Sequence, residues 1–166
     1  MIYSLLNKLD QFKAAPLASA HCDVPCGIYD PSTAQISALS VIRFLDQIAD
    51  LGDGELTRAQ QATLVRLVAE KEAHVAKVKE EVRIIWGDYI KAPQKEQFPQ
   101  IDELVHNIML AGSAAKQHID RANGETLLKL VNEFAEIFWA TKGVDTYTAT
   151  CPYAPNEDVV YPDLKK

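Results

Sequence analysis

The sequence predicts an all-α protein, an antiparallel four-helix bundle with a cysteine-containing N-terminal segment and an extended C-terminal tail. Four stretches repeat apolar residues at three- and four-residue steps, and short turn signals separate them. Two of the three cysteines lie within nine positions near the start, and three prolines interrupt the last stretch. The length of 166 residues suits one domain with a substantial core.

The first helix is predicted to begin at Asp30-Pro31, because aspartate caps free N–H groups and proline suits the first helical position. Its apolar positions recur at near-helical spacing until the turn LGDGE at residues 51–55. These positions are Ile36, Leu39, Leu45 and Ile48.

Three further helices follow from the same periodicity. The second is predicted from Thr57 to Ala92-Pro93, the third from about Pro99 to Asn123-Gly124, and the fourth through Phe134 and Phe138 to Lys142-Gly143. The bundle would therefore cover residues 31–142. The proline-containing remainder, residues 143–166, suits an extended strap rather than a helix.

Charge and cysteine content exclude several classes of protein. The chain has 17 basic and 23 acidic residues, a formal charge of −6, so we expect no nucleic-acid surface. No apolar run approaches the ~18 residues of a membrane span, so we expect no membrane partner. Three cysteines are too few for a secreted disulfide scaffold, which indicates a reducing, cytoplasmic location.

Residues 1–20 are interpreted as a cleavable leader, because they end in the small-residue stretch Ala18-Ser19-Ala20. Polar residues interrupt what a secretory signal would keep apolar, so export is not expected. These are Asn7, Lys8, Asp10, Gln11 and Lys13. The alternative is an amphipathic first helix.

Chemistry along the helices is sparse. No HExxH, GxGxxG, GxxxxGK[ST] or GxSxG motif is present, and His74, His106 and His118 are scattered. The candidate site is instead AHCDVPCGIYDP, residues 20–31. As side chains alone, His21, Cys22 and Cys26 are too few to close a tetrahedral zinc site. A redox-active or incidental cysteine pair without metal is the alternative.

Cleavage after Ala20 would add ligands, because His21 would then carry a free amine beside the Cys22 amide nitrogen. The amine, that amide nitrogen and the Cys22 and Cys26 thiolates can complete a square, with the His21 imidazole axial. Square-planar nitrogen and sulfur ligation suits Ni(II) or Cu(II). Strongly donating thiolate and amide ligands also lower the potential needed to oxidise the metal.

The segment HCDVPCGIYDP, residues 21–31, meets every fixed position of HCDxPCGxYDP, the metal hook of the nickel superoxide dismutase family. WGDYIKAP, residues 86–93, resembles the second motif of that family, and IFWATKG, residues 137–143, continues the resemblance. Together these segments extend the resemblance over most of residues 21–143.

The resemblance implies a superoxide dismutase that a peptidase processes so that the mature chain begins at His21. It would convert superoxide to oxygen and hydrogen peroxide while one nickel ion per subunit alternates between Ni(II) and Ni(III). By similarity, His21 supplies its amine and axial imidazole, Cys22 its amide nitrogen and thiolate, and Cys26 its thiolate. Residues 21–30 would form the nickel-binding hook of each subunit in a homohexamer.

The resemblance also assigns residues around the metal. Pro25 is expected to be cis, and Asp23 to stabilise the hook. Tyr29 and Tyr89 would line a small-anion pocket without ligating the metal. Lys91 would anchor the hook and offset the negative charge that repels an anionic substrate.

Two positions depart from the family pattern. The family usually has a glutamate that accepts a hydrogen bond from the axial imidazole, paired in space with an arginine; the matching positions here are Ser37 and His74. The change puts tuning of the axial ligand in doubt. Cys151 and the tail receive no catalytic role.

Two other functions stay open from the residues. A nickel or copper binding or delivery protein would use the same hook without turnover, although Tyr29 and Tyr89 argue for a substrate pocket. A thiol redox protein would use Cys22 and Cys26, but three residues separate them and no thioredoxin-like βαβ pattern is present.

Overall fold

The structure, a computed structural model, describes residues 26–165. The predicted leader lies outside the described residues, and so do four predicted site residues of the hook: His21, Cys22, Asp23 and Pro25. The other site residues named above fall within the described part of the chain.

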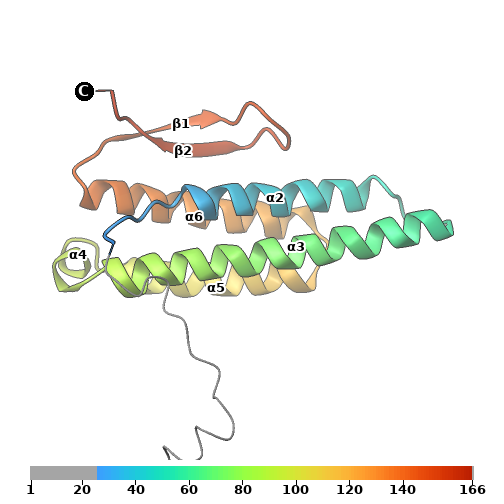
Figure 1. The fold of residues 1–166 in the computed structure, drawn as a ribbon, viewed down its shortest axis with the longest axis horizontal. Helices are drawn as coiled ribbons and strands as arrows, with labels where there is room; N and C mark the ends of the chain where they lie inside the picture. Colours follow the sequence, from blue (N-terminus) through green and yellow to red (C-terminus); the bar gives the residue numbers. More distant parts are fainter. Residues whose placement is uncertain (1–25, 166) are drawn as a thin grey trace, which may run out of the picture.

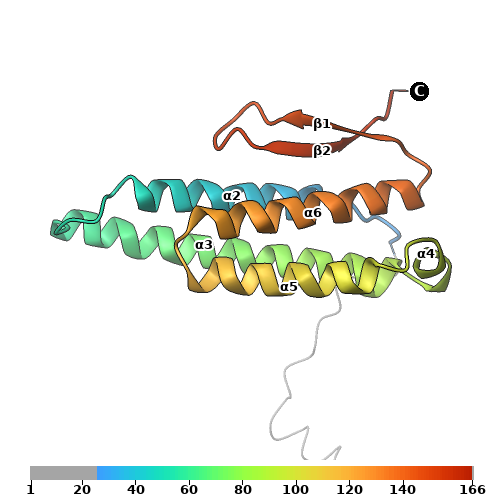
Figure 2. The same ribbon diagram turned by 180° about the vertical axis from the view of Figure 1, so that it is seen from behind.

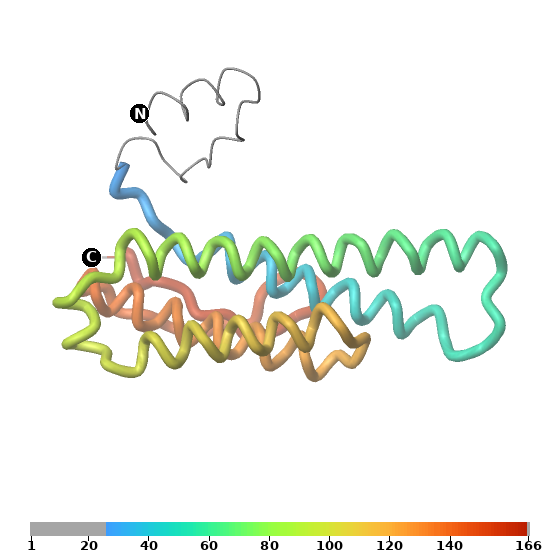
Figure 3. Tube along the Cα trace, turned by 90° about the horizontal axis from the view of Figure 1, so that it is seen from below, coloured from blue at the N-terminus to red at the C-terminus, as the bar shows by residue number. Residues whose placement is uncertain are grey.

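Four long helices lie side by side along the long axis of the molecule (Figure 1). They are α2 (Ser32–Ala49), α3 (Arg58–Ile84), α5 (Ile101–Gln117) and α6 (Arg121–Thr141). We call them the bundle. Helix α2 packs against α3 and α6, and α5 packs against the same two helices, with α3 the longest of the four (Figure 3). The mostly helical fold predicted from the periodicity is confirmed.

Helices α2 and α3 begin close to their predicted starts. The Asp30 carboxylate accepts a hydrogen bond from the Ser32 N–H at 2.7 Å, one residue from the predicted start of α2. Thr57 caps α3: its hydroxyl accepts from the Gln60 N–H at 3.3 Å, while the Gln60 side chain accepts from the Thr57 N–H at 2.9 Å.

The predicted end of the third helix at Asn123-Gly124 is wrong. Helix α5 ends at Gln117, and Asp120 caps α6 by accepting the N–H two residues later at 2.9 Å. Gly124 lies inside α6 at the closest approach to α2, where an added Cβ would meet Ile42 and Leu45 at 2.9 Å. The glycine therefore permits close helix packing rather than ending a helix.

The second predicted helix changes form before it ends. Helix α3 stops at Ile84 and continues as a π turn, η1 (Ile85–Tyr89), closed by the Ile90 N–H donating to the Ile85 carbonyl at 3.2 Å. A short helix that the periodicity did not predict, α4 (Ala92–Gln97), follows before α5.

The tail is a β-hairpin, not a single extended strap. Strands β1 (Thr146–Thr150) and β2 (Asp158–Pro162) pair antiparallel, with Thr148 opposite Val160. The hairpin lies over the face formed by α2 and α6 (Figures 1 and 2). Val160 is buried against that face, as is Cys151, whose thiol donates to the Tyr153 carbonyl at 3.2 Å. We call residues 143–165 the hairpin segment.

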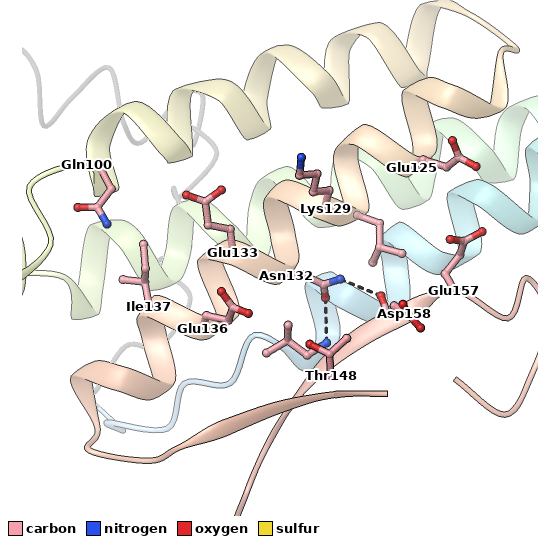
Figure 4. Close-up of a pocket in the computed structure, with 12 residues that line it drawn as sticks. Gln100, Glu125, Lys129, Asn132, Glu133, Glu136, Ile137, Thr148, Glu157 and Asp158 are labelled. Carbon is pink, nitrogen blue, oxygen red and sulfur yellow. Dashed lines mark hydrogen bonds between the residues drawn. The ribbon is translucent and has the colours of Figure 1, made fainter. Parts of the chain in front are cut away.

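Amide side chains attach the hairpin to the bundle. The Asn132 side chain on α6 donates to the Asp158 carbonyl at 2.9 Å and accepts from the Val160 N–H at 3.3 Å, as the dashed lines in Figure 4 show. Buried Gln35 on α2 donates to the Val160 carbonyl at 2.8 Å and to Asn132 at 3.0 Å. These bonds satisfy polar groups that burial would otherwise penalise.

Arg121, at the start of α6, makes the charged connection between the bundle and the hairpin. Its guanidinium donates to Asp46 on α2 at 2.7 Å, to Glu157 of the hairpin segment at 2.5 Å, and to Glu125. Hydrogen bonds to Glu157 and Asp46 raise the pKa of Arg121 further above its already high ordinary value. The hairpin is therefore fixed at its turn as well as along its strands.

Lys71 fixes the far end of the bundle. Its side chain is 1% exposed, and its ammonium donates to the carbonyls of Ala115, Lys116 and His118 at 2.5, 2.8 and 2.9 Å. Those carbonyls end α5 without intrahelical partners, so the lysine caps the helix from α3. Desolvation by burial lowers the pKa of Lys71.

None of the helices among residues 26–165 is both long enough and apolar enough to cross a bilayer.

Candidate functional site

The candidate site lies at the end of the bundle where residues 26–31 enter α2, beside the π turn and the end of α6 (Figure 1). Cys26 is exposed, and its thiol lies 4.0 Å from the Ile28 carbonyl. Gly27 turns the chain with a φ of +69°, a conformation that favours glycine. The turn directs the segment onto the bundle while leaving the Cys26 side chain accessible.

Two tyrosines from distant parts of the chain meet at this end. The ring centroids of Tyr29 and Tyr89 are 5.7 Å apart, with an angle of 38° between the ring planes. Both side chains are half-buried and pack against the hydrophobic core. The structure therefore brings together the two residues that the sequence assigned to one pocket.

The π turn places Tyr89 in this position. In a π turn the backbone hydrogen bond spans five residues rather than four, so one extra residue is accommodated and the side chains change face. Tyr89 is the last residue of η1, and its ring also contacts Phe138 of α6 at a centroid distance of 5.2 Å. Such turns occur often at functional sites.

Thr141 fixes the direction of the Tyr89 hydroxyl. The two hydroxyl oxygens are 2.8 Å apart, and the Thr141 hydroxyl donates its single proton to the Phe138 carbonyl at 2.6 Å. Threonine has no second proton, so Tyr89 is the donor in the bond to Thr141. The Tyr89 oxygen can therefore accept, but not donate, a further hydrogen bond.

The ammonium group of Lys142 lies over the Tyr89 ring, and that of Lys91 lies at the π turn. The Lys142 nitrogen is 4.1 Å from the centroid of the Tyr89 ring and 5.7 Å from that of Phe138, a cation–π arrangement. Lys91 folds back and donates to the Gly87 carbonyl within the π turn at 2.7 Å. Lys142 thus places a positive charge directly against Tyr89 in a chain whose formal charge is −6.

Ser37 and His74 are each bonded within their own helix. Buried Ser37 donates to the Thr33 carbonyl at 2.7 Å, while His74 bonds the Glu70 carbonyl at 2.9 Å and its ring lies 5.3 Å from that of Phe44. Phe44 follows Ser37 by seven residues, or about 10 Å along a helix. Among the described residues, these bonds do not join Ser37 to His74.

The metal ligands predicted from the sequence are described only at Cys26. Residues 26–165 contain no group of three or more His, Cys, Asp or Glu side chains arranged to hold a metal ion. Cys26 itself is exposed beside a glycine turn, and a thiolate is a donor suited to nickel. The chemistry of the Cys26 side chain is therefore compatible with a nickel ligand.

Thr141 and Lys142 are functional candidates that sequence reasoning did not assign. Both lie in the stretch IFWATKG, which carried part of the family resemblance, and that was the available signal. Their roles become visible only when α6 and the π turn are placed side by side. The π turn itself has no signal in the periodicity.

A larger groove lies elsewhere, between α6 and the hairpin (Figure 4). Its volume is about 720 Å³, and carboxylates dominate its polar lining. The charged residues of this acidic groove are Glu125, Lys129, Glu133, Glu136, Glu157 and Asp158. Such a lining would repel a small anion.

Comparison with known proteins agrees on one family. The family described as nickel-containing superoxide dismutase matches residues 16–142. The superoxide dismutase [Ni] of Streptomyces coelicolor is 39% identical over 138 residues, covering 83% of this chain and 98% of the relative. That of Streptomyces seoulensis is 38% identical over 124 residues, covering 75% and 89%.

The solved structures show the same likeness. The native structure of nickel superoxide dismutase superposes with a TM-score of 0.67 at 36% sequence identity. The match covers 74% of this chain and 99% of that one. The family match ends at residue 142, so the hairpin segment follows the matched range.

Proposed function

Because the chain belongs to the nickel-containing superoxide dismutase family, we propose that it converts superoxide to oxygen and hydrogen peroxide with one nickel ion per subunit. The observation that carries the proposal is the family match over residues 16–142. The Tyr29–Tyr89 pair with the Lys142 ammonium over Tyr89 supports it, because a positive charge beside the pair attracts a small anion.

His21, Cys22 and Cys26 would hold the metal. The donors are the His21 amine and imidazole, the Cys22 amide nitrogen and thiolate, and the Cys26 thiolate. Nickel in this ligand set supplies one-electron chemistry through the Ni(II) and Ni(III) states. The exposed Cys26 side chain supports the assignment.

The tyrosines would bind and orient the substrate. The Tyr89 hydroxyl is committed as a donor to Thr141, so its oxygen is an acceptor for a water molecule or a protonated substrate atom. The Tyr29 ring, 5.7 Å away, would form the opposite wall and limit entry of larger reductants. Lys91 and Lys142 would raise the local concentration of superoxide against the negative charge of the whole chain.

Other parts of the proposal rest on the family pattern. Asp23 and a cis peptide at Pro25 would hold the shape of the hook, residues 21–30. Ser37 and His74 would replace the usual partners of the axial imidazole and tune it less strongly than a carboxylate. The four-helix bundle subunits would assemble as a cytoplasmic homohexamer after a peptidase removes the leader, residues 1–20.

The direct test compares protein beginning at His21 with the same protein extended by one alanine. The extension removes the chelating amine without touching the bundle, so nickel-dependent turnover should disappear while the helical circular dichroism is retained. Nickel content and superoxide consumption are measured on both proteins. Full activity in the extended protein would overturn the proposed ligand set. Nickel binding without turnover in the protein that begins at His21 would instead favour metal storage or delivery.

A further inference from the structure

Aromatic rings form a continuous series from the tyrosine pair into α6. The centroid of Tyr29 is 5.7 Å from that of Tyr89, Tyr89 is 5.2 Å from Phe138, and Phe138 is 5.1 Å from Trp139. All four side chains belong to the core or pack against it. The series leads from the candidate site towards the face that the hairpin covers.

The hairpin segment continues this series to the surface. Trp139, Tyr153 and Tyr161 line one cavity of about 180 Å³ between the bundle and the hairpin. The Tyr161 ring centroid is 5.7 Å from that of Tyr147. Tyr147 and Tyr153 are 53% and 49% exposed, so the series ends in contact with solvent.

We propose that this aromatic series conducts oxidising equivalents from the nickel site to the hairpin, where exposed Tyr147 and Tyr153 pass them to a reductant in solution. The series is defined as Tyr29, Tyr89, Phe138, Trp139, Tyr161, Tyr153 and Tyr147. The inference rests on the proposed function, because that reaction produces the oxidant, hydrogen peroxide, next to Tyr29 and Tyr89.

The need for such a route follows from the proposed ligands. Thiolates are oxidised by peroxide through sulfenic to sulfinic and sulfonic acids, and the later steps are irreversible. Cys26 is exposed, and its partner ligand would be a second thiolate. An enzyme that makes peroxide beside its own thiolates benefits when an oxidised neighbour is reduced quickly by electrons from elsewhere in the chain.

The chemistry balances with a thiol as the reductant: one hydrogen peroxide and two thiols become two waters and one disulfide. One hydrogen peroxide accepts two electrons and two protons and leaves as two waters, and two tyrosines each supply one electron and one proton to become phenoxyl radicals. A Tyr89 radical regains an electron from the Trp139 and Tyr161 side and a proton from pocket water. Tyr161 or Tyr153 loses its phenolic proton to solvent as it loses the electron. Both oxidising equivalents reach the exposed tyrosines in this way, and two thiols in solution each return one hydrogen atom and join as a disulfide.

Only part of the aromatic series lies within the range matched by the family, which favours a specific role for the hairpin. Tyr29, Tyr89, Phe138 and Trp139 lie within the range matched by the family, whereas the three tyrosines of the hairpin segment follow it. Without the hairpin segment, the aromatic series would end at Trp139. The added segment therefore supplies the exit to solvent.

The test uses processed, nickel-loaded protein exposed to hydrogen peroxide and compares Trp139→Phe with Trp86→Phe. The chain has two tryptophans, and Trp86 instead bonds Asp102 and carries Lys95 over its ring, so the control makes the same chemical change outside the series. Peptide mass spectrometry measures oxidation of the hairpin tyrosines and of Cys26. Freeze-quench electron paramagnetic resonance detects tyrosyl radicals.

We expect Trp139→Phe to lower oxidation of the hairpin tyrosines several-fold and to increase oxidation of Cys26, while Trp86→Phe matches the wild type. Tyr161→Phe gives the same result if Trp139→Phe fails to fold. Equal hairpin oxidation in all variants, or in nickel-free protein, would show direct attack by peroxide and overturn the inference. Normal superoxide turnover without hairpin oxidation would overturn this inference alone. Loss of turnover in the wild type would refute the proposed function instead.

Discussion

The tyrosine pair and the acidic groove are two regions of opposite character. The groove between α6 and the hairpin has a volume of about 720 Å³, but Glu125, Glu133 and Glu136 from α6 line it. The tyrosine pair instead has the Lys142 ammonium over the Tyr89 ring, and Lys91 donates to the adjoining π turn. A small anionic substrate distinguishes the two by charge, so the size of a hollow is a poor guide to the site.

The largest effect is expected from removing the sulfur donor beside the tyrosine pair. Cys26→Ser should abolish nickel–thiolate absorption and superoxide turnover, because a neutral hydroxyl does not replace an anionic sulfur ligand. Cys151→Ser is the matched control, since that cysteine is buried in the hairpin segment and is not a proposed ligand. A nickel-loaded, active Cys26→Ser protein would remove Cys26 from the metal site.

Reversing the charge of either lysine tests the charge contrast directly. Lys91→Glu and Lys142→Glu should each lower kcat/KM by roughly tenfold at low ionic strength, because focused positive charge speeds anion association. The loss should shrink as salt screens the charges. Pulse radiolysis across a salt series measures both effects.

Lys129→Glu is the control for the lysine variants, because Lys129 lies in the acidic groove. It makes the same change in net charge, and kcat/KM should stay within about twofold if local rather than total charge matters. Equal losses in all three variants would contradict the contrast. Nickel loss in Lys91→Glu would show that this residue seats the hook rather than steers the substrate.

A smaller effect is expected from freeing the Tyr89 hydroxyl. Thr141→Val removes the acceptor that holds the Tyr89 proton, so the hydroxyl would turn its proton towards the pocket. Turnover should fall by about threefold, near the modest net value of one hydrogen bond. Thr141→Ser keeps the hydroxyl and should restore the rate and its pH profile. Identical pH profiles in the valine and wild-type proteins would show that the hydroxyl direction is unimportant.

The smallest effect is expected from changes at Ser37 and His74, which belong neither to the tyrosine pair nor to the acidic groove. Ser37→Glu combined with His74→Arg should strengthen the axial Ni(III) signal in electron paramagnetic resonance and lower the nickel potential, because a carboxylate increases the basicity of the imidazole. Each single variant serves as a control for the pair. An unchanged spectrum and potential in the processed, nickel-loaded double variant would show that these positions do not tune the axial ligand.

The helices were predictable where apolar periodicity alone determines the structure. Periodicity and capping located the starts of α2 and α3 to within a residue or two. The prediction failed at Gly124. Glycine often ends a helix, but here it lies inside α6 and allows that helix to approach Ile42 and Leu45. The paired strands of the tail were also missed, since a strand pattern with prolines does not reveal its pairing partner.

The sequence predicted which residues belong to the candidate site but not how they are arranged in space. The segment with Cys26 and Tyr29 and the motif with Tyr89 could be identified from the sequence, and the structure places the two tyrosines together. Thr141 and Lys142 were missed because their roles arise from the contact between α6 and the π turn. A contact between residues 52 positions apart leaves no local pattern in the sequence.

The π turn also constrains how this protein can change in evolution. An α-helix advances about 100° per residue, so a one-residue deletion between Ile85 and Asp88 would convert the turn to regular helix and rotate Tyr89 away from Tyr29. A substitution in the same stretch would leave that register intact. Lineages that keep the tyrosine pair should therefore tolerate replacements here far more readily than length changes, and insertions should accumulate instead beyond Gly143.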